Sequence, residues 1–121
     1  MKIAITSSGP DIKSEVDPRF GRCQYFIVYD TENNQFETVE NNNVRGMGGV
    51  GIQSAQTMAD KDVKIVITGN CGPNAFRTMN AAGIQLITGA NGTVESVIEE
   101  FKKGNLQPND EPNVEPHSGL N

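Results

Sequence analysis

Residues 63–73, with the sequence VKIVITGNCGP, constrain the fold of this chain more than any other stretch. The β-branched apolar run at the start is typical of a strand buried on both faces of a sheet. It ends at Thr68-Gly69, and the next element opens with Pro73, which is favoured in the first turn of a helix. A buried strand followed by a glycine turn that contains Cys71 indicates a binding edge. An ordinary strand-to-helix connection is the alternative.

Length and composition limit the possible protein classes. A chain of 121 residues is long enough for one domain with a real core. The sequence has no apolar run of membrane-spanning length; no signal peptide is expected, and with two cysteines a reducing cytoplasm is expected. The net charge is −5 and no basic run is present, which argues against nucleic-acid binding. Proline, asparagine and acidic residues over 105–121 predict a disordered tail after a single domain at 1–104.

Hydrophobic periodicity gives the order βββαβαβα. Strands are predicted over 2–6, 24–30, 35–39, 63–67 and 84–87. Helices are predicted from the glycine loop at 46–51 to about residue 60, over 73–82, and from the cap residue Thr93 to about residue 103. Phe36 is assigned to the core, and Ile52 to the same helical face as Met58. The predicted fold is α/β and ribonuclease-H-like, a five-stranded mixed sheet of order 3-2-1-4-5 with the second strand antiparallel and three helices.

This topology brings the unusual residues to one edge of the sheet. The turns after the parallel strands lie there, together with Arg19, Arg22 and Cys23 before the second strand and Arg45 after the third. All three helices are expected to begin there and to present unpaired N–H groups. Open α/β sheets bind ligands where the chain direction splits, here between the first and fourth strands. Glycines and three arginines favour an anion, although the glycine loop matches no nucleotide-binding motif and could be a generic flexible loop.

The two cysteines add softer donors to this edge. Cys23 and Cys71 are expected about two strand spacings of ~4.8 Å apart, beyond the ~7 Å Cα separation that a disulfide tolerates. A sulfide-bridged cluster of several metals could span that distance, whereas a single zinc would need further ligands. His117 is a further candidate ligand, although a solvated tail histidine is the simpler reading. The cysteines could equally be small buried hydrophobic residues.

Several of these segments together resemble one family. They are DPRFGR at 17–22 with Phe26 after it, the glycine-rich helix start, the turn at 68–73 and Ala82-Gly83-Ile84. Over residues 1 to about 104 the chain resembles the dinitrogenase iron–molybdenum cofactor biosynthesis family, with its NifX-like and NifB C-terminal-like members. That resemblance implies a ribonuclease-H-like fold and a carrier of metal–sulfur clusters or their precursors. Nitrogenase-associated members tend to have histidine before Phe-Gly, where this chain has Arg19, which can pair with an anionic cluster but cannot ligate a metal.

We therefore predict a small cytoplasmic, non-enzymatic carrier, monomeric, that binds an iron–sulfur or thiomolybdate-type cluster and exchanges it with donor and acceptor proteins. No catalytic triad, paired carboxylates or dinucleotide fingerprint is present in the sequence. The alternative is a partner-binding or regulatory domain without metal. The metal-ligand candidates are Cys23, Cys71 and His117. The cofactor-binding candidates are Arg19, Phe20, Gly21, Arg22, Arg45, Gly48, Gly49, Gly51, Gly69, Asn70 and Gly72.

Overall fold

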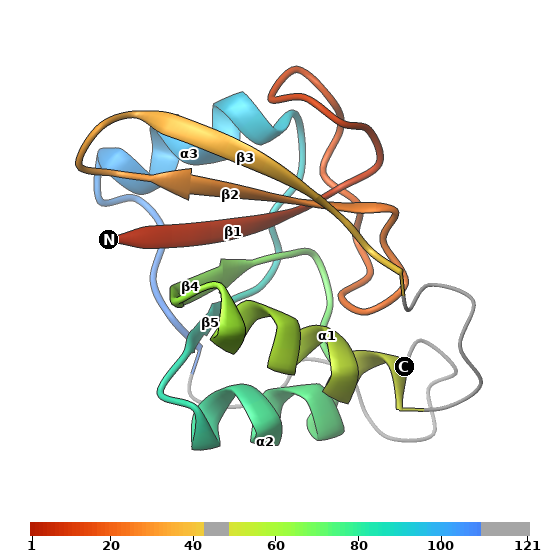
Figure 1. Ribbon diagram of the computed structural model, residues 1–121. Coiled ribbons are helices and arrows are strands. Elements are labelled where there is room, and N and C mark those ends of the chain that lie inside the picture. Colours follow the sequence, from red (N-terminus) through yellow and green to blue (C-terminus); the bar gives the residue numbers. More distant parts are fainter. Residues whose placement is uncertain (43–48, 110–121) are drawn as a thin grey trace.

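A computed structural model of the chain describes residues 1–42 and 49–109 (Figure 1). Its five-stranded sheet has the order β3-β2-β1-β4-β5, and β2 is antiparallel to both of its neighbours. β1 pairs in parallel with β4, and β4 with β5, so the predicted strand order and strand directions are confirmed. The strands are β1 (Lys2–Ser7), β2 (Tyr25–Asp30), β3 (Gln35–Glu40), β4 (Val63–Ile67) and β5 (Gln85–Ile87). The helices are α1 (Val50–Asp60), α2 (Pro73–Ala81) and α3 (Val94–Lys102).

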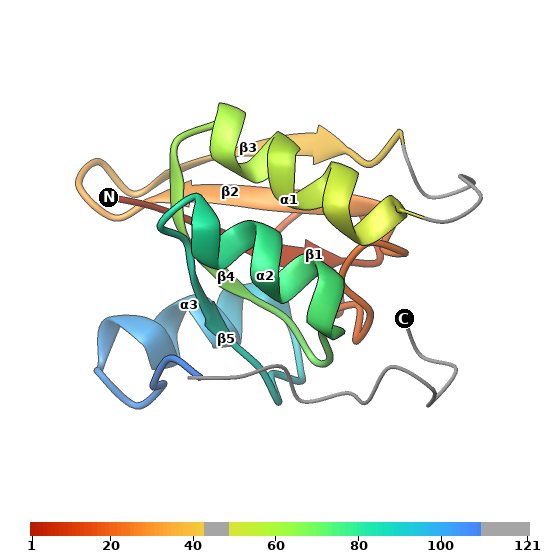
Figure 2. The same ribbon diagram turned by 90° about the horizontal axis from the view of Figure 1, so that it is seen from below.

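The helices cover both faces of the sheet, as Figure 2 shows: α1 and α2 lie on one face and α3 on the other. Alternate residues of the central strands feed two separate cores. On β4, Val66 packs towards α1 and α2, whereas Ile65 and Ile67 pack towards α3. The continuous apolar run at 63–67 is thus explained by burial on both faces. No helix in the described part of the chain is long and apolar enough to cross a membrane.

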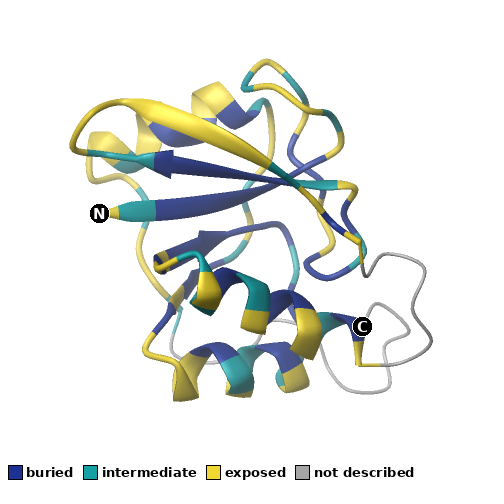
Figure 3. Ribbon diagram, in the orientation of Figure 1, coloured by how far each residue is buried: buried dark blue, intermediate teal, exposed yellow. Residues whose placement is uncertain are grey.

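The outer strand β3 is largely exposed, although one of its residues was predicted to lie in the core. Its residues are mostly exposed, as the yellow ribbon in Figure 3 shows, because the helices cover the middle of the sheet and not this edge. Phe36, which we assigned to the core, is 43% exposed, so that assignment is wrong. Periodicity alone could not reveal this, because alternation in a strand does not say whether a helix lies above it.

The start of the predicted tail is in contact with the domain. Leu106 packs against the core on the α3 face, and Asn109 bridges to Leu86 on β5. The described domain therefore continues through Asn109. Residues 110–121 lie outside the part that the structure describes.

The loop before β2 is joined to the turn after β4 by backbone hydrogen bonds. The Asn70 N–H donates to the Pro18 carbonyl at 2.6 Å, and the Phe20 N–H donates to the Asn70 carbonyl at 3.1 Å. A Cβ atom on Gly69 would lie 2.7 Å from Pro18 Cα and 2.9 Å from its carbonyl oxygen. Only glycine lets the two backbones approach this closely.

Side-chain hydrogen bonds also fix the loop at 17–23 in place. The Asp17 carboxylate accepts a hydrogen bond from the Arg19 N–H at 2.9 Å, and the buried Thr6 hydroxyl donates to the Asp17 carbonyl at 2.6 Å. The buried Asn41 amide donates to the carbonyls of Gly21 at 3.1 Å and Cys23 at 2.8 Å. The loop at 17–23 is therefore a fixed part of the sheet edge.

Replacing Gly69 with Ala tests this attachment. We expect Gly69→Ala to lower the free energy of unfolding by about 1–3 kcal/mol, because the new methyl group meets Pro18 backbone that cannot rotate away. Urea unfolding monitored by circular dichroism measures the change. Gln56→Ala, on the exposed side of α1, is the control and should change stability by less than about 0.5 kcal/mol. Equal stabilities for the two variants would show that the close approach does not matter.

Candidate functional site

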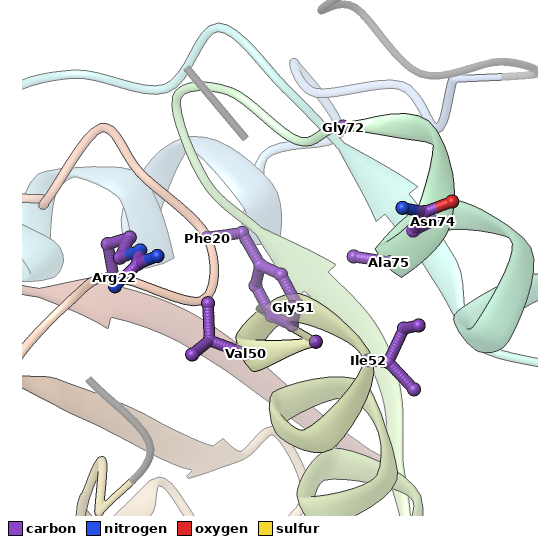
Figure 4. Close-up of a pocket in the computed structure, with 9 residues that line it drawn as sticks. Phe20, Arg22, Val50, Gly51, Ile52, Gly72, Asn74 and Ala75 are labelled. Atoms are coloured by element: carbon purple, nitrogen blue, oxygen red, sulfur yellow. The ribbon is translucent and has the colours of Figure 1, made fainter. Parts of the chain in front are cut away.

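A pocket of about 220 Å³ opens where the loop at 17–23 meets the first turns of α1 and α2 (Figure 4). Arg22 lies on one side of it and Asn74 on the other, and the Phe20 ring lies between Arg22 and the start of α1. Apolar groups make up much of the remaining wall. The lining residues are Phe20, Arg22, Gly49, Val50, Gly51, Ile52, Gly72, Asn74 and Ala75.

Two helix N-termini meet at this pocket, and neither is capped by a side chain. The N-cap residues are Gly49 for α1 and Gly72 for α2, and a glycine has no side chain to accept a hydrogen bond. The first-turn N–H groups of a helix have no acceptor within the helix. In α1 these N–H groups belong to residues 50–52, and in α2 to Asn74 and Ala75, because Pro73 has none. All of these residues line the pocket, which makes its floor a concentration of backbone donors and positive dipole ends.

Small residues allow the two helix starts to lie so close together. A Cβ atom on Gly51 would lie 3.1 Å from the Ala75 Cβ, and one on Gly21 would lie 3.0 Å from the Gly51 Cα. Gly21 also has a φ of 94°, a conformation that favours glycine. Larger residues at these positions would separate the loop, α1 and α2, and would move the first-turn donors apart.

The third helix does not belong to this site, which corrects our expectation that all three helix starts would contribute. The Thr93 hydroxyl caps α3 as predicted, accepting a hydrogen bond from the Ser96 N–H at 3.1 Å. The Val94 N–H donates to the Ser14 carbonyl at 2.9 Å, and the Glu95 N–H donates to the Ile12 carbonyl at 2.7 Å. The first turn of α3 is on the opposite face of the sheet and its donors are already used by the protein.

The predicted arginines differ in their positions. Arg22 lines the pocket, whereas Arg19 has a side chain that is 52% exposed, with its Nε atom 3.5 Å from the Asp17 carboxylate. Arg19 pairs with this acid and is absent from the pocket lining. Arg45 and Gly48 lie outside the described residues.

Both cysteines are core residues. Cys23 is fully buried and Cys71 is 2% exposed, and both pack in the core between the sheet and α1 and α2. Burial, with a smaller contribution from the nearby Asp17 charge, raises the pKa of Cys23 to about 12. Burial also raises the pKa of Cys71 to about 12. Because metals bind the thiolate, these thiols are poorly prepared to act as ligands at neutral pH.

Residues 1–42 and 49–109 form no cluster of metal-ligand side chains. Within those ranges, no group of three or more His, Cys, Asp or Glu side chains could hold a metal ion. His117, the remaining candidate ligand, lies outside the described residues.

The other predicted residues support the pocket or complete its wall. Phe20, Gly49, Gly51 and Gly72 line the pocket; Gly21, Gly69 and Asn70 hold the loop behind it. Sequence reasoning missed four lining residues, Val50, Ile52, Asn74 and Ala75. Ile52 was placed with the core face of its helix but is 37% exposed. A signal for all four was their position in the first turn of a helix after a glycine, the turn whose N–H groups have no acceptor within the helix.

Comparisons with known proteins agree with this architecture. The family model described as "Dinitrogenase iron-molybdenum cofactor" matches residues 1–104. An uncharacterised protein of Methanocaldococcus jannaschii is 33% identical over 110 residues, covering 88% of this chain and 90% of that protein.

Two solved structures are similar over most of their length. The apo form of the orange protein from Desulfovibrio gigas superposes with a TM-score of 0.90 at 36% identity, covering 93% of this chain and 96% of that one. A NifB-like protein from Thermotoga gives a TM-score of 0.78 at 40% identity, covering 88% of this chain and 91% of that one. The chain therefore belongs to the dinitrogenase iron-molybdenum cofactor family.

Proposed function

We propose that this protein is a small cytoplasmic carrier that binds an anionic metal–sulfur cluster, containing iron, molybdenum or both, in the pocket between α1 and α2. The cluster is cargo, received from a donor protein and passed to an acceptor protein, and no bond is made or broken in it by the carrier. The observation that carries this proposal is the meeting of two helix N-termini, without side-chain caps, beside Arg22. Family membership is consistent with it.

The charge of the site favours an anion. Each helix N-terminus is equivalent to about half a positive charge, so two helix starts and one guanidinium supply about two charges. Backbone donors are already oriented by the helices, so little conformational entropy is lost when they bind an anion. An anionic ligand in this pocket would also reduce the repulsion between the two positive helix dipole ends.

The size and the apolar lining of the pocket limit which anions could bind there. A volume of about 220 Å³ is below the ~300–1,000 Å³ that is usual for drug-sized ligands, so a compact inorganic anion fits better than a nucleotide. Side chains of Phe20, Val50 and Ile52 add apolar surface to the lining of the pocket. Such a lining cannot hydrogen-bond the oxygens of a strongly hydrated oxyanion, and it suits a polarisable sulfide surface better.

Arg22 is the residue whose removal tests the site. We expect Arg22→Gln to weaken binding of tetrathiomolybdate by about 10- to 100-fold, because a hydrogen bond to a charged group contributes about 1.5–3 kcal/mol. Binding is measured without oxygen, by visible absorbance and by metal bound after gel filtration. Molybdate serves as the oxyanion control ligand, and Lys103→Gln, a change of equal charge at the far end of α3, serves as the control variant.

The cysteines separate two ways of holding the cluster. Binding in this pocket by arginine and backbone donors predicts that a Cys23→Ala/Cys71→Ala double variant keeps its affinity for tetrathiomolybdate. Loss of uptake in that variant, with Arg22→Gln unaffected, would instead make the thiols the ligands and contradict the pocket assignment. No uptake by any form of the protein, from tetrathiomolybdate or from iron and sulfide, would favour a regulatory domain without metal.

The buried thiols also predict a pH dependence of stability. Their pKa is raised from 9.0 to about 12 in the folded chain, so the folded state holds protons that the unfolded state loses. The free energy of unfolding should therefore be unaffected below about pH 9 and should fall as the pH rises towards about 12. Urea unfolding at pH 8 and pH 10.5 measures this, and the double Ala variant should lose less stability between the two. An equal loss in both proteins would mean that the thiols are not protected by burial.

A further inference from the structure

The two edges of the sheet are protected in different ways. The outer strand at one edge, β3, carries Glu37 and Glu40, and charged side chains on an edge strand oppose pairing with another chain. At the other edge, β5 has the sequence QLI and carries no charge. A short apolar edge strand with free backbone groups is a template for strand addition.

The chain after α3 occupies this uncharged edge. Leu106 packs with the core on the α3 face, while Pro108 and Asn109 border a pocket with Phe76 on the α2 face. The segment therefore passes around β5 from one face of the sheet to the other, as the blue ribbon beside β5 in Figure 2 indicates. It lies beyond residue 104, where the family model ends.

Asn109 makes three hydrogen bonds to this edge. Its backbone N–H donates to the Leu86 carbonyl at 2.6 Å, and its side-chain oxygen accepts from the Thr88 N–H at 3.0 Å. Its amide nitrogen donates to the Thr88 hydroxyl at 2.7 Å. Leu86 and Thr88 present these backbone groups on the side away from β4, because the Ile87 carbonyl between them accepts from Thr68 N–H.

We propose that residues 106–109 form an edge cap, in which Asn109 takes the place of a neighbouring strand and keeps β5 from pairing with β5 of a second copy of this chain. The second copy is the partner that the edge fits, because two identical edges related by a twofold axis pair antiparallel and close into a dimer. The cap keeps the protein monomeric at the edge that lacks charge. This inference does not depend on the proposed cluster binding.

Substitutions at Asn109 test the cap in the full chain. Asn109→Ala removes both side-chain hydrogen bonds, and Asn109→Pro also removes the backbone N–H donor. We expect hydrogen exchange of the Thr88 amide, measured in dilute solution where the variants are monomeric, to become about tenfold faster or more in each, since one hydrogen bond shifts an opening equilibrium by about that factor. Sedimentation velocity should show a dimer whose fraction rises with concentration, in the order wild type, Asn109→Ala, Asn109→Pro.

Two control variants separate the cap from general effects of the tail. Asn109→Asp keeps an acceptor for the Thr88 N–H and can accept from its hydroxyl, so exchange of the Thr88 amide should match that of wild type. Gln107→Ala changes an exposed side chain whose hydrogen bond, within the described residues, is to the Gly104 carbonyl, and it should also behave as wild type. Unchanged Thr88 exchange in dilute, monomeric Asn109→Pro would overturn the proposal. A monomeric Asn109→Pro at every concentration, or a wild type that dimerises equally well, would also overturn it.

Discussion

The site depends on the close approach of two backbones, at Pro18 and at the turn that begins with Gly69. Hydrogen bonds on both sides of Asn70 lock the loop before β2 to the end of β4. This contact holds the loop that contributes buried Phe20 to the core and Arg22 to the pocket lining. It also crosses the boundary between the first and fourth strands, where the chain direction of an open sheet splits. The edge that carries the pocket is therefore fixed to the central strands of the sheet.

The helix N-termini differ in whether a side chain caps them. At α3, a threonine and two loop carbonyls satisfy the first-turn donors, as expected of a helix end that only has to be stable. At α1 and α2, the N-cap residues are glycines, which have no side chain to accept from the first-turn donors. Glycine at an N-cap is less favourable than serine or threonine by only a few tenths of a kcal/mol, so the two glycine caps together cost a small amount of stability. Anion binding at these positions would offset that cost, which links the choice of glycine to function.

The sheet order was predictable from the sequence because a hairpin followed by right-handed crossovers leaves few arrangements. The gathering of Arg22 and the glycine turns at one edge follows from the same topology. The burial of the two cysteines could not be predicted from the topology. Position on a strand places Cys23 and Cys71 near the edge, but only side-chain packing shows that both are buried among apolar neighbours. Ile52 and Phe36 were misplaced for a related reason, since periodicity identifies a face without showing what covers it. The role of Asn109 was hidden in a segment whose composition resembles disorder.

The central claim is that the starts of α1 and α2 together form the anion site. Titration of ¹⁵N-labelled protein with tetrathiomolybdate tests it most directly, because amide chemical shifts report hydrogen bonds formed by individual N–H groups. The account predicts saturable shifts that are largest at residues 50–52 and at Asn74 and Ala75, with the Val94 and Glu95 amides unchanged. Shifts that are largest at the start of α3, or that are spread evenly over the surface, would contradict it.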